Sequence, residues 1–118
     1  LLPDTSEYIL LLSLSLQKGA CIEGNDQYNN YQILRAMNYM EEILKDCLRK
    51  SDVAARYSNS QFILLLPLLD YQDCLLVSNR ITTNLYNRIG IQKIKIKRDL
   101  IEINTNQKEQ RKSIQFII

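Results

Sequence analysis

Apolar residues gather near the start of the chain in one short run. Residues 8–16 are Tyr-Ile-Leu-Leu-Leu-Ser-Leu-Ser-Leu, and the polar residues 3–7 precede them. A mostly apolar run of this length is typical of a strand that is buried on both faces. We therefore predict a central strand here, followed by a polar loop over residues 17–30.

Apolar residues then recur at steps of three and four. Charged residues fall between them, and the apolar positions are Ile33, Met37, Met40, Leu44, Cys47 and Leu48. This spacing predicts a helix with one stripe facing a core, ending near Lys50. A second stripe consists of Cys74, Val77, Ile81 and Leu85. It predicts a second helix, with Asp70 as its N-cap and Gly90 at its C-terminal end.

Two short runs between these helices predict a β-hairpin. Residues 53–57 and 61–67 are separated by Ser-Asn-Ser, which is the spacing of two strands joined by a tight turn. Asn59 is the turn residue best able to adopt a positive φ. After the second helix, residues 93–97 and 100–103 alternate like strands with one solvated face, and we expect a bend or turn between them.

The order of these elements predicts the fold class. Strand, helix, strand, strand, helix, strand indicates an α/β (α+β) ferredoxin-like sandwich, with both helices on one face of a mostly antiparallel sheet. The right-handed crossover rule places the first strand in the middle of the sheet, beside the second hairpin strand. We expect residues 1–118 to form a single domain, with residues 105–118 as a tail or an extra strand.

The amino-acid composition excludes several classes of function. The 118 residues include no histidine, which excludes Ser-His-Asp and Cys-His catalytic units and histidine-containing zinc sites. The net charge of +2 is too small for nucleic-acid binding by bulk charge. No run is long enough to span a membrane.

The cysteines and the start of the chain bear on its location. Cys21, Cys47 and Cys74 form no C-x-x-C pair and are odd in number, which indicates reduced thiols in a cytoplasmic protein. The chain begins with Leu and carries no signal peptide. We therefore expect that the protein is cytoplasmic and that this chain is a fragment of a longer protein.

Residues 48–67 resemble the central signature of GGDEF domains, the diguanylate cyclase family. That signature is R-x-x-D, five residues, G-G-D/E-E-F, and an apolar strand ending in Pro. Arg49 and Asp52 match R-x-x-D, Phe62 matches the last letter of the second motif, and Pro67 closes the strand. The resemblance extends over residues 8–103 and implies a nucleotidyl-cyclase-type sandwich.

The chain departs from this family at the positions that would carry cyclase chemistry. In the family, two glycines let the backbone approach the nucleotide, and the acids that follow help to hold two divalent metals. Those four positions carry Ser58, Asn59, Ser60 and Gln61. The family's D-x-D of the first strand falls on Gln17 and Gly19, or on Ser13 and Ser15. We therefore expect no catalytic residue, no metal, no cofactor and no enzyme activity.

The retained residues leave alternatives open. In the family, R-x-x-D is an inhibitory site that binds cyclic di-GMP, so Arg49 and Asp52 could form a nucleotide sensor. The same two residues could instead order the turn after the first helix. Asn25 matches a guanine-contacting Asn of the family, but it could simply cap the helix. Arg56 could bind an anion or lie on a solvated face.

Residues 55–62 also resemble degenerate GGDEF-like modules at the C-terminal end of some bacterial transcriptional activators with winged-helix and tetratricopeptide-like domains. This resemblance implies an inactive regulatory or interaction module of a bacterial signalling protein. Its expected partners are neighbouring domains of the full-length protein or a second copy of the chain. The alternative is a sensor of cyclic di-GMP or another nucleotide. Direct nucleic-acid binding and membrane binding by this domain are not expected. Lys93, Lys95 and Lys97 form either a solvated sheet face or a contact for an acidic partner.

Overall fold

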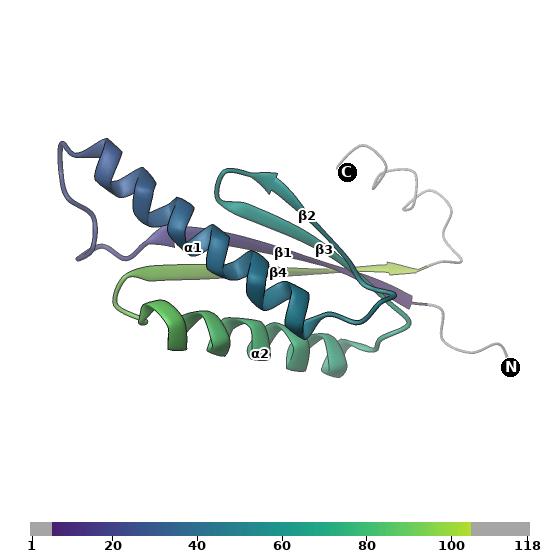
Figure 1. The fold of residues 1–118 in the computed structure, drawn as a ribbon. Coiled ribbons are helices and arrows are strands. Elements are labelled where there is room, and N and C mark those ends of the chain that lie inside the picture. The colour runs from purple at the N-terminus through teal and green to yellow at the C-terminus, as the bar shows by residue number, and fades with distance from the viewer. Residues whose placement is uncertain (1–5, 105–118) are drawn as a thin grey trace, which may run out of the picture.

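The fold is a four-stranded sheet with two helices on one of its faces (Figure 1). The structure, a computed structural model, describes residues 6–104. The elements in chain order are β1 (Ser6–Leu16), α1 (Asp26–Cys47), β2 (Val53–Ser58), β3 (Gln61–Pro67), α2 (Tyr71–Ile89) and β4 (Ile94–Asn104). The predicted α+β sandwich is confirmed. The expectation for residues 105–118 lies outside the described residues.

β1 lies in the middle of the sheet, as the crossover rule predicts. The strand order is β2-β3-β1-β4, and all three neighbouring pairs are antiparallel. In the register of the sheet, Leu10 of β1 lies between Leu64 of β3 and Leu100 of β4. Apolar side chains at successive positions of β1 can therefore be buried by neighbours on both sides.

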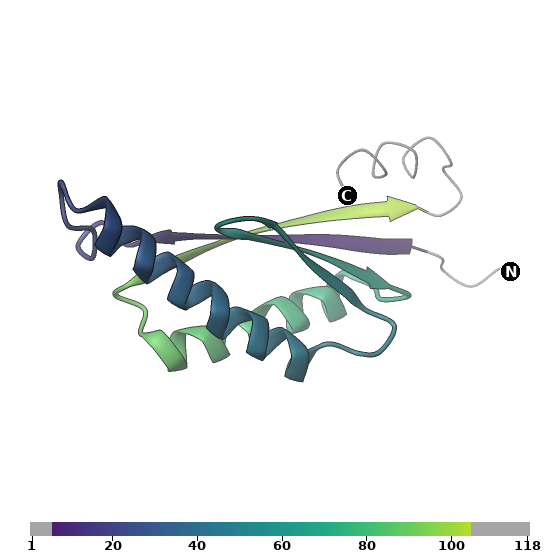
Figure 2. The same ribbon diagram turned by 45° about the horizontal axis from the view of Figure 1, so that its top comes forward.

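The main core lies between the sheet and the two helices, which Figure 2 shows on the same side of the strands. β1 contributes Tyr8, Leu10, Leu12 and Leu14 to this core. The predicted helical stripes meet these residues, and their fully buried members include Met37, Met40, Ile81 and Leu85. Helical periodicity therefore identified the correct faces of both helices.

α1 begins within the stretch that the sequence predicts as a loop. Its N-cap is Asn25, whose side chain accepts a hydrogen bond from the backbone N–H of Tyr28 at 3.0 Å. The first turns of α1 are largely exposed and polar, so they carry no apolar stripe that would reveal a helix. At the other end, the C-cap is Leu48, close to the predicted end.

β4 runs without a break, and the predicted bend at residues 98–99 is wrong. Arg98 and Asp99 keep the register with Leu12 and Leu11 of β1. The Arg98 side chain lies on the helix side, where its Nη1 donates to Asn79 Oδ1 at 2.6 Å. A charged residue in this strand therefore finds a polar partner on α2 and does not need to leave the sheet.

The turn geometry differs from the prediction at one position. Among the described non-glycine residues, Leu68 is the one with a positive φ, 56°, so the expectation for Asn59 is wrong. The turn of the hairpin is instead stabilised by the hydroxyl of Ser58, which donates to Gln61 Oε1 and accepts from the Ser60 backbone N–H. The predicted end of α2 is confirmed, because its C-cap Gly90 has a φ of 96°.

Candidate functional site

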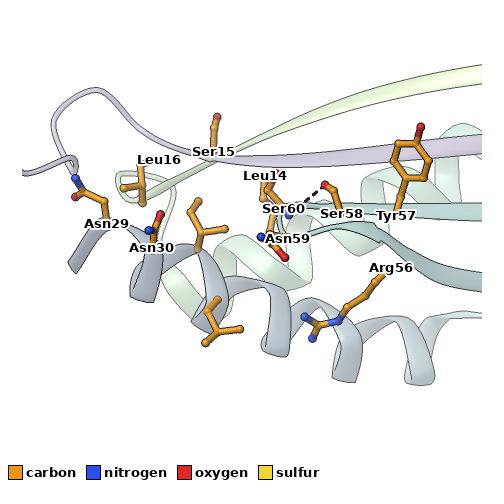
Figure 3. A pocket seen from close by; sticks show the side chains of 12 residues that line it. Leu14, Ser15, Leu16, Asn29, Asn30, Arg56, Tyr57, Ser58, Asn59 and Ser60 are labelled. Carbon is orange, nitrogen blue, oxygen red and sulfur yellow. Dashed lines mark hydrogen bonds between the residues drawn. The ribbon is translucent and has the colours of Figure 1, made fainter. Parts of the chain in front are cut away.

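A cavity of about 860 Å³ lies between the first half of α1 and the tip of the β2–β3 hairpin (Figure 3). α1 contributes the amides of Asn29 and Asn30, and the hairpin contributes residues 58–60. The apolar lining comes from β1 and α1 and consists of Leu14, Leu16, Ile33 and Leu34. This cavity is the candidate functional site, because it is lined by three of the five hairpin residues that occupy the positions of the family motif, namely Ser58, Asn59 and Ser60.

Hydrogen bonds within the hairpin fix the polar side chains at the edge of the cavity. Ser58 Oγ donates to Gln61 Oε1 at 2.8 Å and accepts from the Ser60 backbone N–H at 3.3 Å. Gln61 Nε2 donates to Ser13 Oγ of β1 at 3.1 Å. Phe62 is buried in the main core. The structure therefore places Ser58, Asn59 and Ser60 at the cavity, whereas the side chains of Gln61 and Phe62 are engaged elsewhere.

The donor set of this site does not fit two divalent cations. Hydroxyl and amide groups line the hairpin side of the cavity, whereas Mg²⁺ binds through carboxylates and substrate phosphates. Neither register proposed for the D-x-D pair places an acid at its two positions, which carry Gln17 and Gly19 or Ser13 and Ser15. Gln17 Nε2 instead donates to the carbonyl of Ile91 at 3.1 Å. Among residues 6–104, no three acidic, cysteine or histidine side chains lie close enough together to hold a metal ion.

Arg49 and Asp52 form a compact pair at the opposite end of α1. Arg49 Nη2 donates to Asp52 Oδ1 at 2.7 Å, and the Arg49 backbone N–H donates to Asp52 Oδ2 at 2.8 Å. The same Nη2 donates to the carbonyl of Pro67 at 2.7 Å, which links the turn after α1 to the end of β3. The hydrogen bond to Asp52 raises the pKa of the Arg49 guanidinium above its usual value. This geometry matches the structural role considered from the sequence.

Arg56 connects β2 to α1, a role that sequence reasoning missed. Its Nη2 donates to Asn38 Oδ1 at 3.0 Å and lies 3.5 Å from Glu41 Oε2, and its guanidinium lies 5.4 Å from the ring centroid of Phe62. Arg56 also lines both the hairpin cavity and a second groove of about 460 Å³ between α1 and β2. No local pattern could reveal a partner on an element 18 residues away.

Asn29 and Asn30 were also missed as candidate site residues. They lie in the stretch that was predicted as a loop, so no helix face could be assigned to them. A polar pair on the first turns of a helix, opposite a hairpin tip, becomes recognisable as a site only after the chain is folded. Figure 3 shows the two asparagines on α1 and the hairpin residues on the facing strands.

Known proteins of the same fold include several diguanylate cyclases. A DGC protein from Thermotoga maritima has 18% identity and a TM-score of 0.66, over 96% of this chain and 76% of its own. The GGDEF domain of DgcB from Caulobacter crescentus, in complex with c-di-GMP, has 15% identity and a TM-score of 0.67, over 87% of this chain and 63% of its own. Diguanylate cyclase SiaD from Pseudomonas aeruginosa, in complex with its activator SiaC, has 20% identity and a TM-score of 0.57, over 91% of this chain and 42% of its own. At these identities the likeness shows the fold alone.

Sequence comparison extends the relationship beyond the fold. The sequence profile of the family described as "Diguanylate cyclase, GGDEF domain" matches residues 25–103, which include the hairpin and the Arg49–Asp52 pair. A search of curated proteins finds no match. None of the described helices is both long enough and apolar enough to cross a membrane.

These findings contradict the expectation that the chain is not an enzyme. That expectation rested on residues 58–61 and on the missing acids of β1, and it treated a few ligand positions as decisive. The family profile matches residues 25–103, a range that includes the hairpin, and the structural neighbours include diguanylate cyclases. Substitutions at single positions therefore do not separate the chain from this enzyme family. The chain belongs to the GGDEF domain family of diguanylate cyclases.

Proposed function

We propose that this domain acts in cyclic di-GMP signalling by binding a guanine nucleotide in the hairpin cavity, as one domain of a larger bacterial signalling protein. The observation that carries the proposal is the cavity itself, which lies at the hairpin that gives the family its name. A cavity of about 860 Å³ is within the range of small-molecule and cofactor sites. The related DgcB domain is described in complex with c-di-GMP.

The lining of the cavity suits a nucleotide. The amides of Asn30 and Asn59 can each donate and accept hydrogen bonds, as the edge of a guanine base requires. The amide of Asn29 is instead bonded to the backbone N–H and carbonyl of Ile22 and fixes the loop beside the cavity. Ile33 and Leu34 offer an apolar surface to the flat faces of the base. The guanidinium of Arg56 at the margin of the cavity can pair with a phosphate group.

The domain would transmit a conformational change on nucleotide binding to other parts of the signalling protein that contact it. Arg56 connects β2 to α1, so a ligand that binds its guanidinium would weaken the hydrogen bond to Asn38. The surface of α1 would then change where a neighbouring domain or a second copy docks. SiaD is described with a protein activator, which supports regulation by protein contact in this fold. We propose a cytoplasmic transcription regulator as the full-length protein, on the resemblance of residues 55–62.

Calorimetric titration with GTP, with and without magnesium, tests this proposal. We expect micromolar binding to the unaltered chain and at least a tenfold weakening in Leu34→Trp, because the indole would fill part of the cavity. Leu76→Trp is the matched control, since Leu76 is also an exposed leucine but lies on α2. Absence of GTP binding, or equal binding by the two variants, would contradict the proposal. Assay of cyclic di-GMP formation in the same samples measures the activity of the chain directly.

A second candidate function is reception of cyclic di-GMP at Arg49 and Asp52. The groove of about 460 Å³ beside this pair favours it, because Lys45 and Lys50 add positive charge to the same lining. Titration with cyclic di-GMP would then show binding that Arg49→Ala abolishes and Arg80→Ala, a control on the exposed surface of α2, retains. Binding that survives in both variants would exclude this site.

A further inference from the structure

The face of the sheet opposite the helices carries its own apolar cluster. This open-face cluster consists of Ile9, Leu11, Ile63, Leu65 and Ile103. The register explains how these residues from three strands meet: Leu65 and Ile101 flank Ile9, and Ile63 lies beside Leu11. The cluster lies toward the end of the sheet where β1 begins and β4 ends. At the other end of β4, Lys95 and Lys97 lie beside Ser15 and Ser13, so the same face becomes polar there.

The burial of this cluster requires a cover. Ile9 is 3% exposed, Ile63 is 8% exposed and Ile103 is 2% exposed. Both α1 and α2 pack on the opposite face, and no described element lies over the cluster (Figure 2). Ile103 is particularly informative, because β4 is an edge strand with a sheet neighbour on only one side. By contrast, Ile101 of the same strand is 47% exposed.

We propose that residues 105–118 of this chain pack on the open-face cluster. The segment follows Asn104, the last residue of β4, so in the sequence it starts two residues after Ile103. Its first nine residues are polar, and its last five contain four large apolar residues, namely Ile114, Phe116, Ile117 and Ile118. The pattern is that of a polar connection followed by an apolar segment that needs a surface to cover it.

The connection is long enough for this packing. Ile63 lies on β3, two strands from β4, which corresponds to about 10 Å across a sheet. Nine extended residues can span roughly 30 Å, so the apolar residues reach the whole cluster even if the connection is far from straight. Attachment to β4 also favours this segment over a separate molecule, because tethering gives an effective concentration on the order of millimolar.

Nuclear Overhauser measurements on the unaltered chain test the proposal directly. With isoleucine methyl groups labelled, we expect contacts between the ring protons of Phe116 and the methyl groups of Ile9, Ile63 and Ile103. A mixture of labelled and unlabelled chains separates contacts within one chain from contacts between two. Absence of these contacts overturns the proposal, and contacts found only between chains overturn it in favour of a second copy.

A matched pair of substitutions provides the second measurement. Phe116→Asp should shift the Ile9 and Ile63 methyl resonances and raise the fluorescence of an apolar dye severalfold, because the cluster becomes accessible. Gln115→Asp adds the same charge at a neighbouring polar position and should leave both signals unchanged. Equal effects of the two substitutions would show that charge, and not loss of packing, is responsible, and would overturn the proposal.

Discussion

Arg49 and Asp52 show how much one residue pair can contribute to the structure. The Asp52 side chain is 2% exposed, whereas that of Arg49 is roughly half exposed. A carboxylate removed from water to this extent needs hydrogen-bond donors, and here they come from the guanidinium and the backbone N–H of Arg49. The guanidinium also holds the carbonyl of Pro67. The pair therefore stabilises the connection between α1 and β3, whether or not it also binds a nucleotide.

Arg49→Ala should lower the free energy of unfolding by about 1–2 kcal/mol, because Asp52 would keep one backbone donor and lose the charged one. Urea denaturation followed by circular dichroism measures the change. Arg80→Ala, which removes an exposed arginine of α2, should alter the stability by less than about 0.5 kcal/mol. A loss no greater than that of the control would show that the pair is not structural.

Cys74 is fully buried in the core, and this burial raises the pKa of its thiol to about 11. Thiolates are the reactive form, so iodoacetamide at pH 8 should modify the exposed Cys21 first and Cys74 last. Mass spectrometry of the digested protein measures the order. Rapid modification of Cys74 in the folded chain would contradict the structure at this point.

The same thiol predicts a change of stability with pH. Because the folded state holds the proton to a higher pH than the unfolded state, the contribution is constant below pH 9 and falls between pH 9 and about pH 11. Cys74→Ser should remove this part of the alkaline loss of stability. Thermal melting from pH 7 to pH 11 tests the prediction, and identical profiles for both proteins would contradict it.

At the scale of elements, helix ends are set by caps that periodicity does not detect. Asn25 caps α1, and Asp70 caps α2 by accepting from the backbone N–H of Asp73 at 2.8 Å. The second cap was predicted because an apolar stripe begins directly after it. Asn25 was considered as a cap from the sequence, but the predicted loop extended to residue 30 because the turns that follow Asn25 are exposed and polar.

Asn25→Ala should destabilise the domain by about 1 kcal/mol, since the Tyr28 backbone N–H loses its acceptor. Asn87→Ala is the control, because this exposed asparagine lies within α2, where alanine is the better helix former. It should therefore leave the stability unchanged or raise it slightly. Chemical denaturation distinguishes the two, and the same sign of change for both would disprove the cap.

At the scale of the whole molecule, the sheet separates two apolar regions of different size. Leu12 of β1 points into the main core and is fully buried, and Leu11 belongs to the smaller open-face cluster. The two positions are adjacent in sequence and lie on opposite faces, because side chains alternate along a strand. They therefore allow the two regions to be compared with the same substitution.

Leu12→Ala should cost about 2–5 kcal/mol, the range for a leucine removed from a packed core. That is a large share of the 5–15 kcal/mol that typically stabilises a domain, so the variant should unfold at much lower urea concentration. Leu11→Ala should cost clearly less, because this side chain is only partly buried. Equal losses would show that the open face contributes as much as the main core.

Most of the fold could be predicted from the sequence because its signals are local. The stripe containing Met37 and Met40, the spacing of the hairpin and Gly90 each depend on neighbours within a few residues. The continuity of β4 could not be predicted, because Arg98 stays in the strand through a partner on α2. The turn at Asn59 was also mispredicted, because hydrogen bonds between the Ser58 hydroxyl and residues 60 and 61 stabilise it without a positive φ.

The candidate site, too, could be predicted from the sequence only in part. The motif positions at residues 49–62 could be read from the chain, and so could the family resemblance, because both depend on residue types at fixed spacing. The cavity could not, because α1 and the β2–β3 hairpin form it only after β1 pairs with β3 and α1 packs across the sheet.

The sequence by itself determined the order of the elements, the faces of the helices and the family resemblance. Only the tertiary structure decided what each motif residue does: Ser58 to Ser60 line a cavity, Phe62 is in the core, and Arg49 is bonded to Asp52 and Pro67. The physical reason is that periodicity and turn chemistry act between neighbours in the chain. The partners of a side chain, by contrast, depend on packing between elements that are far apart in the sequence.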